Sequence, residues 1–292
     1  MVPIAVAVIS NGLTIGLIYS LAAAGVTILY GSIWMPNASN GQFFALGGIF
    51  FWLGIRLLGV GRSAYPALAL GTLLLAAGVA LLLEAALFRR FYDRADRNYI
   101  YFILTLGLAQ VMSGFFSVTV GPISDAYAVP QVVPGILMVA GSPVPYARIV
   151  VLAFACLAVV SLVVWLRMHR IGLALRALFQ DRDGAALRGV DVHKVFRLAY
   201  LLGTLICVMA GILYVVAFPM DLTTGWSVAV TTFAIMIVGG PGSVLGSMVI
   251  ALIFGFLQAV VSLLANPVLA QFAYLIAMLV VLVCRPEGLF TR

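Results

Sequence analysis

Charged side chains are scarce in this sequence: Asp, Glu, Lys and Arg make up 9% of the 292 residues, whereas hydrophobic residues make up 64%. A water-soluble domain needs about a quarter of its residues charged to cover its surface. The mean hydropathy is +1.21. This composition excludes a soluble protein, so the outer surface must face lipid. No polar stretch is long enough for an appended soluble domain, and we expect residues 1–292 to form a single transmembrane domain.

Lysine is nearly missing, because Lys194 is the single one in the chain. A Walker A loop has the pattern G-x-x-x-x-G-K-[ST], in which the lysine follows a glycine-rich turn and precedes a hydroxyl residue. Lys194 stands in DVHKV, without that turn and without Ser or Thr after it. The chain therefore does not hydrolyse ATP by this route, and we expect a non-enzymatic protein with no cofactor and no catalytic residue of its own.

Histidines and membrane-buried carboxylates are also few. The two histidines, His169 and His193, both lie in a basic segment, so a metal site inside the membrane has no ligands and we expect none. Glu84 is the only one of nine carboxylates inside an apolar run, and we expect it to pair with Arg89 or Arg90 at the interface. Without a nucleotide site or a proton relay, the chain has no evident energy source for uphill transport.

Long apolar runs are abundant. A helix needs about 20 residues to cross lipid, and eight runs approach this length: 11–33, 41–60, 64–88, 98–120, 146–166, 195–217, 243–265 and 268–284. The sequence therefore predicts an all-α polytopic membrane protein with about eight transmembrane helices. The shorter run 227–238 ends in GGPGS, and we interpret it as a broken or re-entrant segment, which is allowed where protein or water covers the backbone.

Basic residues mark the orientation of these runs. Most of the 16 lie in three regions, 89–97, 167–197 and 285–292, and the positive-inside rule places such regions in the cytoplasm. The net charge of +7 thus reflects membrane orientation and not nucleic-acid binding. The proline-rich loop 121–145 is then external, the amino terminus outside and the carboxyl terminus cytoplasmic. An odd number of crossings must follow the outer connection near 218–226, so the short run should supply one of them.

The segment 171–194 is a second region of interest, because seven of the chain's 25 charged residues lie in its last part, 176–194. Asp183 can cap a short helix that begins at Gly184, and Gly189 can end it in the left-handed conformation. So short a helix is unstable alone. Its small residues allow close approach, so we expect it to dock into a groove on another protein.

Five segments, in this order, resemble the permease subunit of ATP-binding-cassette importers of the branched-chain amino acid type. They are NGLTIGLIYSLAAAGVTILYG (11–31), NASNGQFFALGG (37–48), RALFQDRDGAALRGVDVHKVFRLAYLLGT (176–204), VGGPGSVLGSMVIALIFG (238–255) and RPEGLF (285–290). The resemblance implies that 182–190 is the coupling helix received by an ATPase subunit. Its residues are Arg182, Asp183, Gly184, Ala185, Ala186, Leu187, Arg188, Gly189 and Val190.

The same resemblance implies a set of partners and a location. The partners are a second permease subunit, related but different, two ATP-binding subunits that hold ATP and Mg²⁺, and a periplasmic solute-binding protein. The location is the bacterial inner membrane. The chain departs from the family in one place: the family commonly reads N-F-A-H-G-E where this chain reads NASNGQ, so neutral amides, Asn40 and Gln42, replace the histidine and the glutamate. The cargo then need not be a branched-chain amino acid, and amides, urea-like solutes, other amino acids and aromatic acids stay open.

Polar residues within the spans are candidates for the solute path, because each would be costly against lipid. They are Asn11, Tyr19, Asn40, Gln42, Gln110, Ser113, Thr231 and Gln258. The alternative is that they only bridge helices. Our functional hypothesis is a permease subunit that forms the pathway for an amino acid or a related small polar or amphipathic solute. A gradient-driven carrier that acts without ATPase partners and a membrane scaffold without a pathway are the alternatives.

Overall fold

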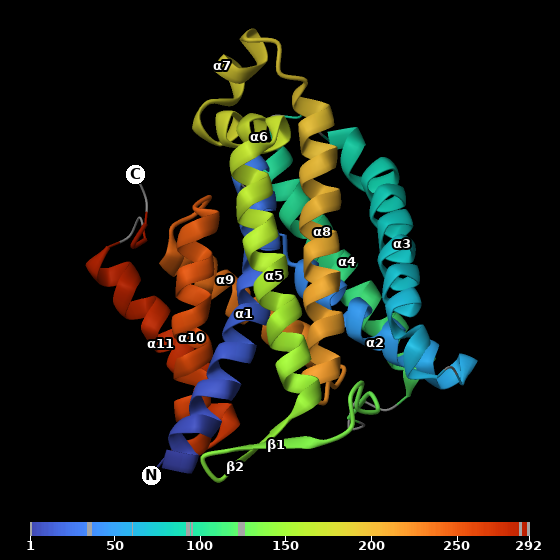
Figure 1. The fold of residues 1–292 in the computed structure, drawn as a ribbon. Helices are drawn as coiled ribbons and strands as arrows, with labels where there is room; N and C mark the ends of the chain where they lie inside the picture. Colours follow the sequence, from blue (N-terminus) through green and yellow to red (C-terminus); the bar gives the residue numbers. More distant parts are fainter. Residues whose placement is uncertain are drawn as a thin grey trace.

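The structure is a computed structural model that describes residues 2–33, 37–59, 61–91, 94, 96–121, 126–285 and 288–290. The long helices run side by side in one bundle (Figure 1). Each of the eight expected apolar runs coincides with one helix: α1 (Val2–Ile33), α2 (Asn40–Leu58), α3 (Tyr65–Leu83), α4 (Arg97–Val120), α5 (Tyr146–Met168), α8 (Val192–Ala217), α10 (Val244–Leu264) and α11 (Pro267–Cys284).

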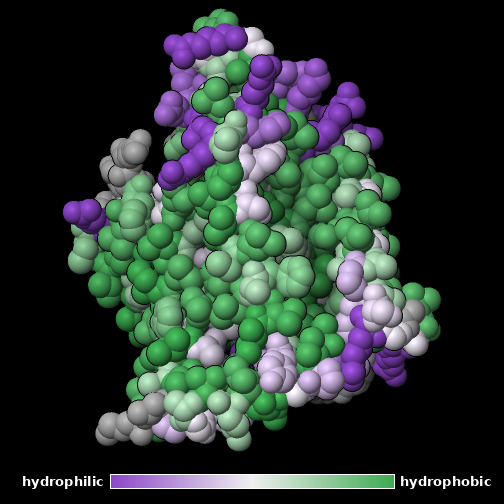
Figure 2. Space-filling view, in the orientation of Figure 1, coloured by the Kyte–Doolittle hydropathy of each residue, from purple (hydrophilic) through white to green (hydrophobic). Residues whose placement is uncertain are grey.

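Seven helices of the described part are long and apolar enough to cross a membrane, and α9 (Thr224–Gly239) and Phe272–Cys284 are shorter apolar helices. Hydrophobic side chains cover the middle of the molecule in Figure 2, and hydrophilic ones gather at the end formed by α6 (Arg170–Gln180) and α7 (Arg182–Leu187). The predicted all-α polytopic membrane fold is therefore confirmed.

The segment expected to be broken is one continuous helix. α9 has 16 residues and ends where Gly240 takes a φ of 97°, after which a turn leads into α10. Asp221 sets its start: Oδ1 accepts hydrogen bonds from the Thr224 N–H at 2.7 Å and from the Thr223 hydroxyl at 2.8 Å. The interruption therefore lies after this helix and not within it.

A real interruption inside the bundle precedes α2. Asn37, Ala38 and Ser39 are non-helical and buried, while 34–36 lie outside the described residues. The Ala38 N–H donates to Oγ1 of Thr105 at 3.4 Å, and Thr105 lies eight residues into α4, about 12 Å from its start at the helical rise per residue. α2 thus starts within the bundle (Figure 1), where surrounding protein satisfies the exposed backbone.

Helix α1 is the centre of the bundle, and its glycines bring neighbouring backbones close. A Cβ on Gly25 would lie 2.6 Å from the carbonyl oxygen of Gly203 in α8. A Cβ on Gly255 of α10 would lie 2.4 Å from Cα of Gly16. Small residues at such crossings let membrane helices associate through backbone contacts, so α1, α8 and α10 form a tightly packed core.

The two ends of the bundle differ. At one end β1 (Ile136–Val139) and β2 (Ser142–Pro145) form an antiparallel hairpin within the loop expected to be external, of which 122–125 lie outside the described residues. The chain's start lies at this end (Figure 1). At the other end, Leu289 donates to the Val238 carbonyl at 2.9 Å, beside the α9–α10 turn. The two chain ends therefore lie at opposite ends of the bundle; which end faces the cytoplasm stays a prediction.

The remaining helical segments link these elements. A 3-10 turn, η1 (Arg62–Ala64), precedes α3, and the π-helical η2 (Glu84–Phe88) and the 3-10 turn η3 (Arg89–Phe91) extend it. π-helical turns are rare and are found mostly within α-helices. The buried positions of α3 continue through this turn at a spacing of four residues, from Ala76 and Ala80 to Glu84 and Phe88.

Candidate functional site

The charged segment forms α6 and α7, which project from one end of the bundle (Figure 1). The capping residue of α7 is Asp181, whose Oδ1 accepts from the Asp183 N–H at 3.1 Å. The expectation of an Asp183 cap and a start at Gly184 was therefore wrong, and α7 begins two residues earlier, at Arg182. The reason is local: Asp181 adopts an extended backbone with φ −157°, as a capping residue does, whereas Asp183 is helical.

The end of α7 follows the prediction. Gly189 has a φ of 85°, in the left-handed region that favours glycine. Gly184 has a different role, because a Cβ there would lie 2.4 Å from Oδ2 of Asp181. Glycine at 184 thus makes room for the capping carboxylate.

A groove runs beside α7 with a volume of about 660 Å³. It is lined by Arg182, Asp183, Ala186, Val190, Asp191, Val192 and His193. Ala185 is buried beneath, but Leu187 is 90% exposed at this hydrophilic end of the molecule. A large apolar side chain with mixed charges around a groove fits a surface that another protein covers.

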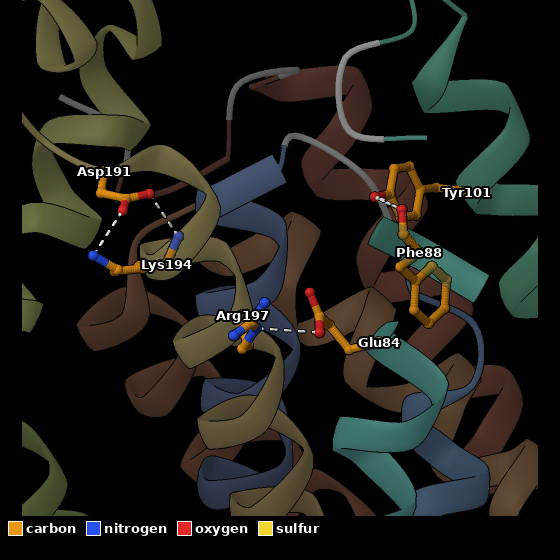
Figure 3. Close-up of polar contacts among 6 residues, drawn as sticks. All are labelled: Glu84, Phe88, Tyr101, Asp191, Lys194 and Arg197. Atoms are coloured by element: carbon orange, nitrogen blue, oxygen red, sulfur yellow. Dashed lines mark hydrogen bonds and ion pairs between the residues drawn. The ribbon is translucent and has the colours of Figure 1, made fainter. Parts of the chain in front are cut away.

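Asp191 joins this segment to α8. Its Oδ1 accepts from the Lys194 N–H at 3.1 Å, and Oδ2 lies 3.1 Å from Nζ of Lys194 (Figure 3). The hydrogen bonds from the backbone and the side chain of Lys194 hold the pKa of Asp191 below its ordinary value. Asp191 therefore carries its negative charge at the positive end of the α8 dipole at neutral pH.

An ion pair lies one turn further along α8. Arg197 Nε is 3.2 Å from Oε2 of Glu84, whose side chain is 2% exposed (Figure 3). The expected pairing of Glu84 with Arg89 or Arg90 is corrected, because Glu84 is buried in line with Ala80 while both arginines are exposed.

An aromatic group adjoins this ion pair. The Tyr101 hydroxyl of α4 donates to the Phe88 carbonyl at 2.8 Å, and the two rings stack at 5.3 Å. The Phe88 ring also lies 5.1 Å from the Tyr200 ring of α8. The start of α8, directly after the α7 segment, is thus tied to both α3 and α4.

Two of the predicted path residues meet between α1 and α10. Gln258 accepts at Oε1 a hydrogen bond of 2.5 Å from the Tyr274 hydroxyl of α11, and Tyr19 of α1 lies close enough to interact with Gln258. Asn11 accepts instead from Nη1 of Arg148 in α5. Each of these amides joins two or three helices, which is the bridging alternative considered above.

The side-chain amides at the start of α2 differ. Asn40 is 2% exposed and Gln42 is 1% exposed, and among the described residues neither atom of either amide has a hydrogen-bond partner. They are located where non-helical backbone enters the bundle. Polar groups at such a place are the type that lines solute sites in repeat-built transporters.

Comparison with known proteins identifies the family. The model of the family "branched-chain amino acid transport system / permease component" matches residues 8–283. The chain belongs to this family. It is 26% identical to the high-affinity branched-chain amino acid transport system permease protein LivH of Salmonella typhimurium and to that of Escherichia coli strain K12. It is 24% identical to the permease protein BraD of Pseudomonas aeruginosa. Each match covers 97% of this chain and 94% of the relative.

A solved structure agrees on the fold. The chain is similar to one chain of PsaBC from Streptococcus pneumoniae, in complex with Fab, with a TM-score of 0.51 and 13% identity. The match covers 96% of this chain and 92% of that one. The fold of this permease component thus has a solved structural counterpart along nearly its whole length.

The other three predicted path residues of this permease component lie on α4 and α9. Gln110 is exposed on α4 and Ser113 is half-buried. Thr231 is buried in α9, but its hydroxyl donates within its own helix, to the Ser227 carbonyl at 2.8 Å. These three residues do not join one site.

Sequence reasoning missed two interior residues of the permease component. Tyr200 and Thr204 of α8 are buried, and neither hydroxyl has a hydrogen-bond partner within the described ranges. Their spacing of four residues, continued at Val208 and Gly211, marks one face of a helix. The sequence alone indicates this face of α8, but it does not indicate that the face packs against the start of α2.

Proposed function

We propose that this chain is the permease subunit of an ATP-binding-cassette importer in the bacterial inner membrane, and that it carries an amino acid or a related small polar solute. The observation that supports it most is the α7 surface, where Leu187 is 90% exposed beside a charged groove. Family membership and the absence of a Walker A pattern in the sequence support it as well.

In this proposal α7 is received by one of two ATP-binding subunits, which hold ATP and Mg²⁺. Arg182 and Asp183 supply charges of both signs to the contact, and Leu187 supplies apolar area. Closure of the ATPases on ATP displaces α7, and the displacement reaches α8 through the Asp191 cap. The Arg197–Glu84 ion pair then couples α8 to α3. A related second permease subunit completes the pathway, and a periplasmic binding protein delivers solute at the hairpin end.

The test is purification of the complex from native membranes through a tag on this chain. We expect a second permease chain and an ATPase activity to co-purify. Leu187→Asp should remove the ATPase activity and retain the second permease, because the substitution charges only the α7 surface. ATP-independent, concentrative uptake by the chain alone in liposomes, abolished by an ionophore, would instead establish a gradient-driven carrier.

A further inference from the structure

In the part of the chain that the structure describes, six buried polar atoms on α2 and α8 lack a hydrogen-bond partner. They are both amide atoms of Asn40, both amide atoms of Gln42, the Tyr200 hydroxyl and Oγ1 of Thr204. None of these residues is more than 2% exposed. Buried polar groups in proteins are nearly always hydrogen-bonded, and lipid supplies no substitute. Several unpaired atoms in one part of a membrane bundle indicate a place for a polar ligand.

Contacts connect the two helices in this region. The Phe43 ring lies 6.4 Å from the Tyr200 ring, edge to face. A Cβ on Gly211 would lie 1.9 Å from the carbonyl oxygen of Phe44, so the backbones nearly touch. Thr204 lies between Tyr200 and Gly211 on the same face of α8. The first two turns of α2 therefore pack along the face of α8 that carries the two unpaired hydroxyls.

The first turn of α2 also contacts α9. A Cβ on Gly41 would lie 2.1 Å from the Gly225 carbonyl oxygen. Gln42 Oε1 lies 2.9 Å from the position that a Cβ on Gly225 would take. The amides are thus enclosed by protein on the α8 and α9 sides, well inside the bundle.

Backbone groups at the start of α2 have hydrogen-bond partners, so the unpaired atoms here belong to side chains. Asn37 Oδ1 accepts from the Ser39 N–H at 2.9 Å, and the Ser39 carbonyl accepts from the Gln42 N–H at 2.9 Å. Asn37 and Ser39 thus satisfy several backbone N–H groups of this turn, although Ser39 makes no side-chain cap hydrogen bond. An anion held by free N–H groups of the helix end does not explain the unpaired amides.

The chemistry of the four side chains defines the ligand. Two carboxamides, a phenol and an alcohol are all uncharged, and each both donates and accepts hydrogen bonds. Glu84, the carboxylate in the same turn as Phe88, is already in an ion pair with Arg197. A ligand carboxylate only accepts hydrogen bonds and an apolar group does neither, so each would leave buried groups unpaired.

We propose that the start of α2 is a solute subsite that binds an uncharged carboxamide group of the transported molecule. Like the side chains of Asn40 and Gln42, a carboxamide both donates and accepts hydrogen bonds. It can therefore pair with the amides and with the hydroxyls of this site. The proposal rests on the proposed transport function and specifies its substrate class. Water also donates and accepts, so the test separates a solute amide from water alone.

The test compares three amino acids of similar size: L-glutamine, L-leucine and L-glutamate, which end in an amide, an alkyl group and a carboxylate. ATP-driven uptake of each is measured with the complete complex in proteoliposomes. We expect glutamine to be preferred at least tenfold over both others. Asn40→Leu and Gln42→Leu should each remove most of that preference, while the matched control Gln131→Leu, at an exposed loop residue, should keep it.

A second measurement uses the full chain alone in nanodiscs, so that a failed complex does not leave the proposal undecided. Glutamine at 10 mM, and neither leucine nor glutamate, should raise its melting temperature, and Gln42→Leu should abolish the rise. Both leucine variants should melt no lower than the wild type, because they remove unpaired buried amides. Equal effects of the three solutes would overturn the proposal, and no effect of any would show a site for water only. Failure of the transport function is a separate result, seen as no ATP-driven uptake of any solute.

Discussion

Glu84 carries its carboxylate into a part of the protein from which solvent is nearly excluded, whereas its partner Arg197 is 44% exposed. The two residues therefore contribute unequally. Loss of the arginine removes the ion pair from a buried carboxylate, but loss of the glutamate leaves a cation that water still reaches. Removal of one partner is costly when the remaining charge is buried.

We expect Arg197→Met to lower the free energy of unfolding by about 2 kcal/mol, and Glu84→Gln by about 1 kcal/mol, because the amide keeps the shape and a hydrogen bond. Arg197→Lys is the matched control and should lose less than Arg197→Met. Thermal unfolding of the purified chain in one detergent measures all three. Equal losses of unfolding free energy in Arg197→Met and Glu84→Gln would show that burial of the Glu84 carboxylate does not determine the cost of breaking the ion pair.

Asp221, just before the start of α9, is a second residue whose contribution to stability can be measured. Burial by itself raises the pKa of Asp221, but hydrogen bonds from the Thr224 and Thr223 side chains and backbones outweigh it and hold the pKa below its ordinary value. Its stabilisation is therefore complete above the unfolded pKa of about 3.9 and is lost as the pH falls through the lower folded value.

Asp221→Ala should cost about 1 kcal/mol at pH 7, as loss of a helix-capping group does. The difference in melting temperature between wild type and Asp221→Ala should shrink as the pH falls below about 4, because the wild-type carboxylate is then protonated. Asp221→Asn, which keeps an acceptor oxygen without a titrating charge, should show no such loss with pH. A difference that grows towards acid pH would contradict the sign of the pKa shift.

At the scale of elements, α7 combines residues with two different duties. Gly184 makes room for the Asp181 cap, so a side chain there disturbs the helix itself. Ala186 is exposed and lines the groove, so a side chain there alters only the surface. A substitution at 184 therefore does not separate folding from docking, but one at 186 does.

We expect Ala186→Trp to lower ATP-driven transport at least tenfold while the melting temperature of the chain changes by less than about 2 °C, as for most surface substitutions. Gly184→Leu should lower transport as well, but it should also lose the cap. Hydrogen exchange of the Asp183 amide reports the cap directly. Normal transport by Ala186→Trp in a complex that still contains its ATPases would show that the groove is not the docking surface.

The elements show where sequence reasoning succeeds and where it stops. Seven of the eight apolar runs predicted the helices that are long enough to span, because span length is set by the membrane and not by tertiary contacts, and the eighth run is the shorter helix of α11. The Asp183 cap failed because Asp181 competes for the same turn two residues earlier, and propensity does not distinguish them. The Glu84–Arg197 pair joins residues more than a hundred positions apart and requires the folded bundle.

The candidate interior site could be predicted only in part from the sequence, because it too depends on contacts between distant helices. Asn40 and Gln42 stood out as amides in an apolar context, but their lack of partners depends on how α2 packs against α8 and α9. Tyr200 and Thr204 share a face of α8 that the helical period reveals. The sequence does not show that this face packs against the start of α2. That contact exists because the non-helical residues Asn37 to Ser39 are buried, so that α2 begins inside the bundle.

At the scale of the whole molecule, the two ends of the bundle belong to different compartments if basic residues mark the cytoplasm. Residues 136–145 form the hairpin at one end, where Met138 is 72% exposed, and Leu187 is 90% exposed at the other. Both positions are far from the described helix crossings. Each accepts a cysteine without loss of packing.

Single cysteines at these positions test the orientation in intact cells whose outer membrane has been made permeable. The background variant carries alanine at Cys156, Cys207 and Cys284. Met138→Cys should react with a membrane-impermeant maleimide added from outside, and Leu187→Cys should react only after the inner membrane is opened. Because the chain ends lie at opposite ends of the bundle, this result would also place the amino terminus outside and the carboxyl terminus in the cytoplasm. Labelling of Leu187→Cys from outside would invert the whole molecule and remove α7 from the reach of any cytoplasmic ATPase.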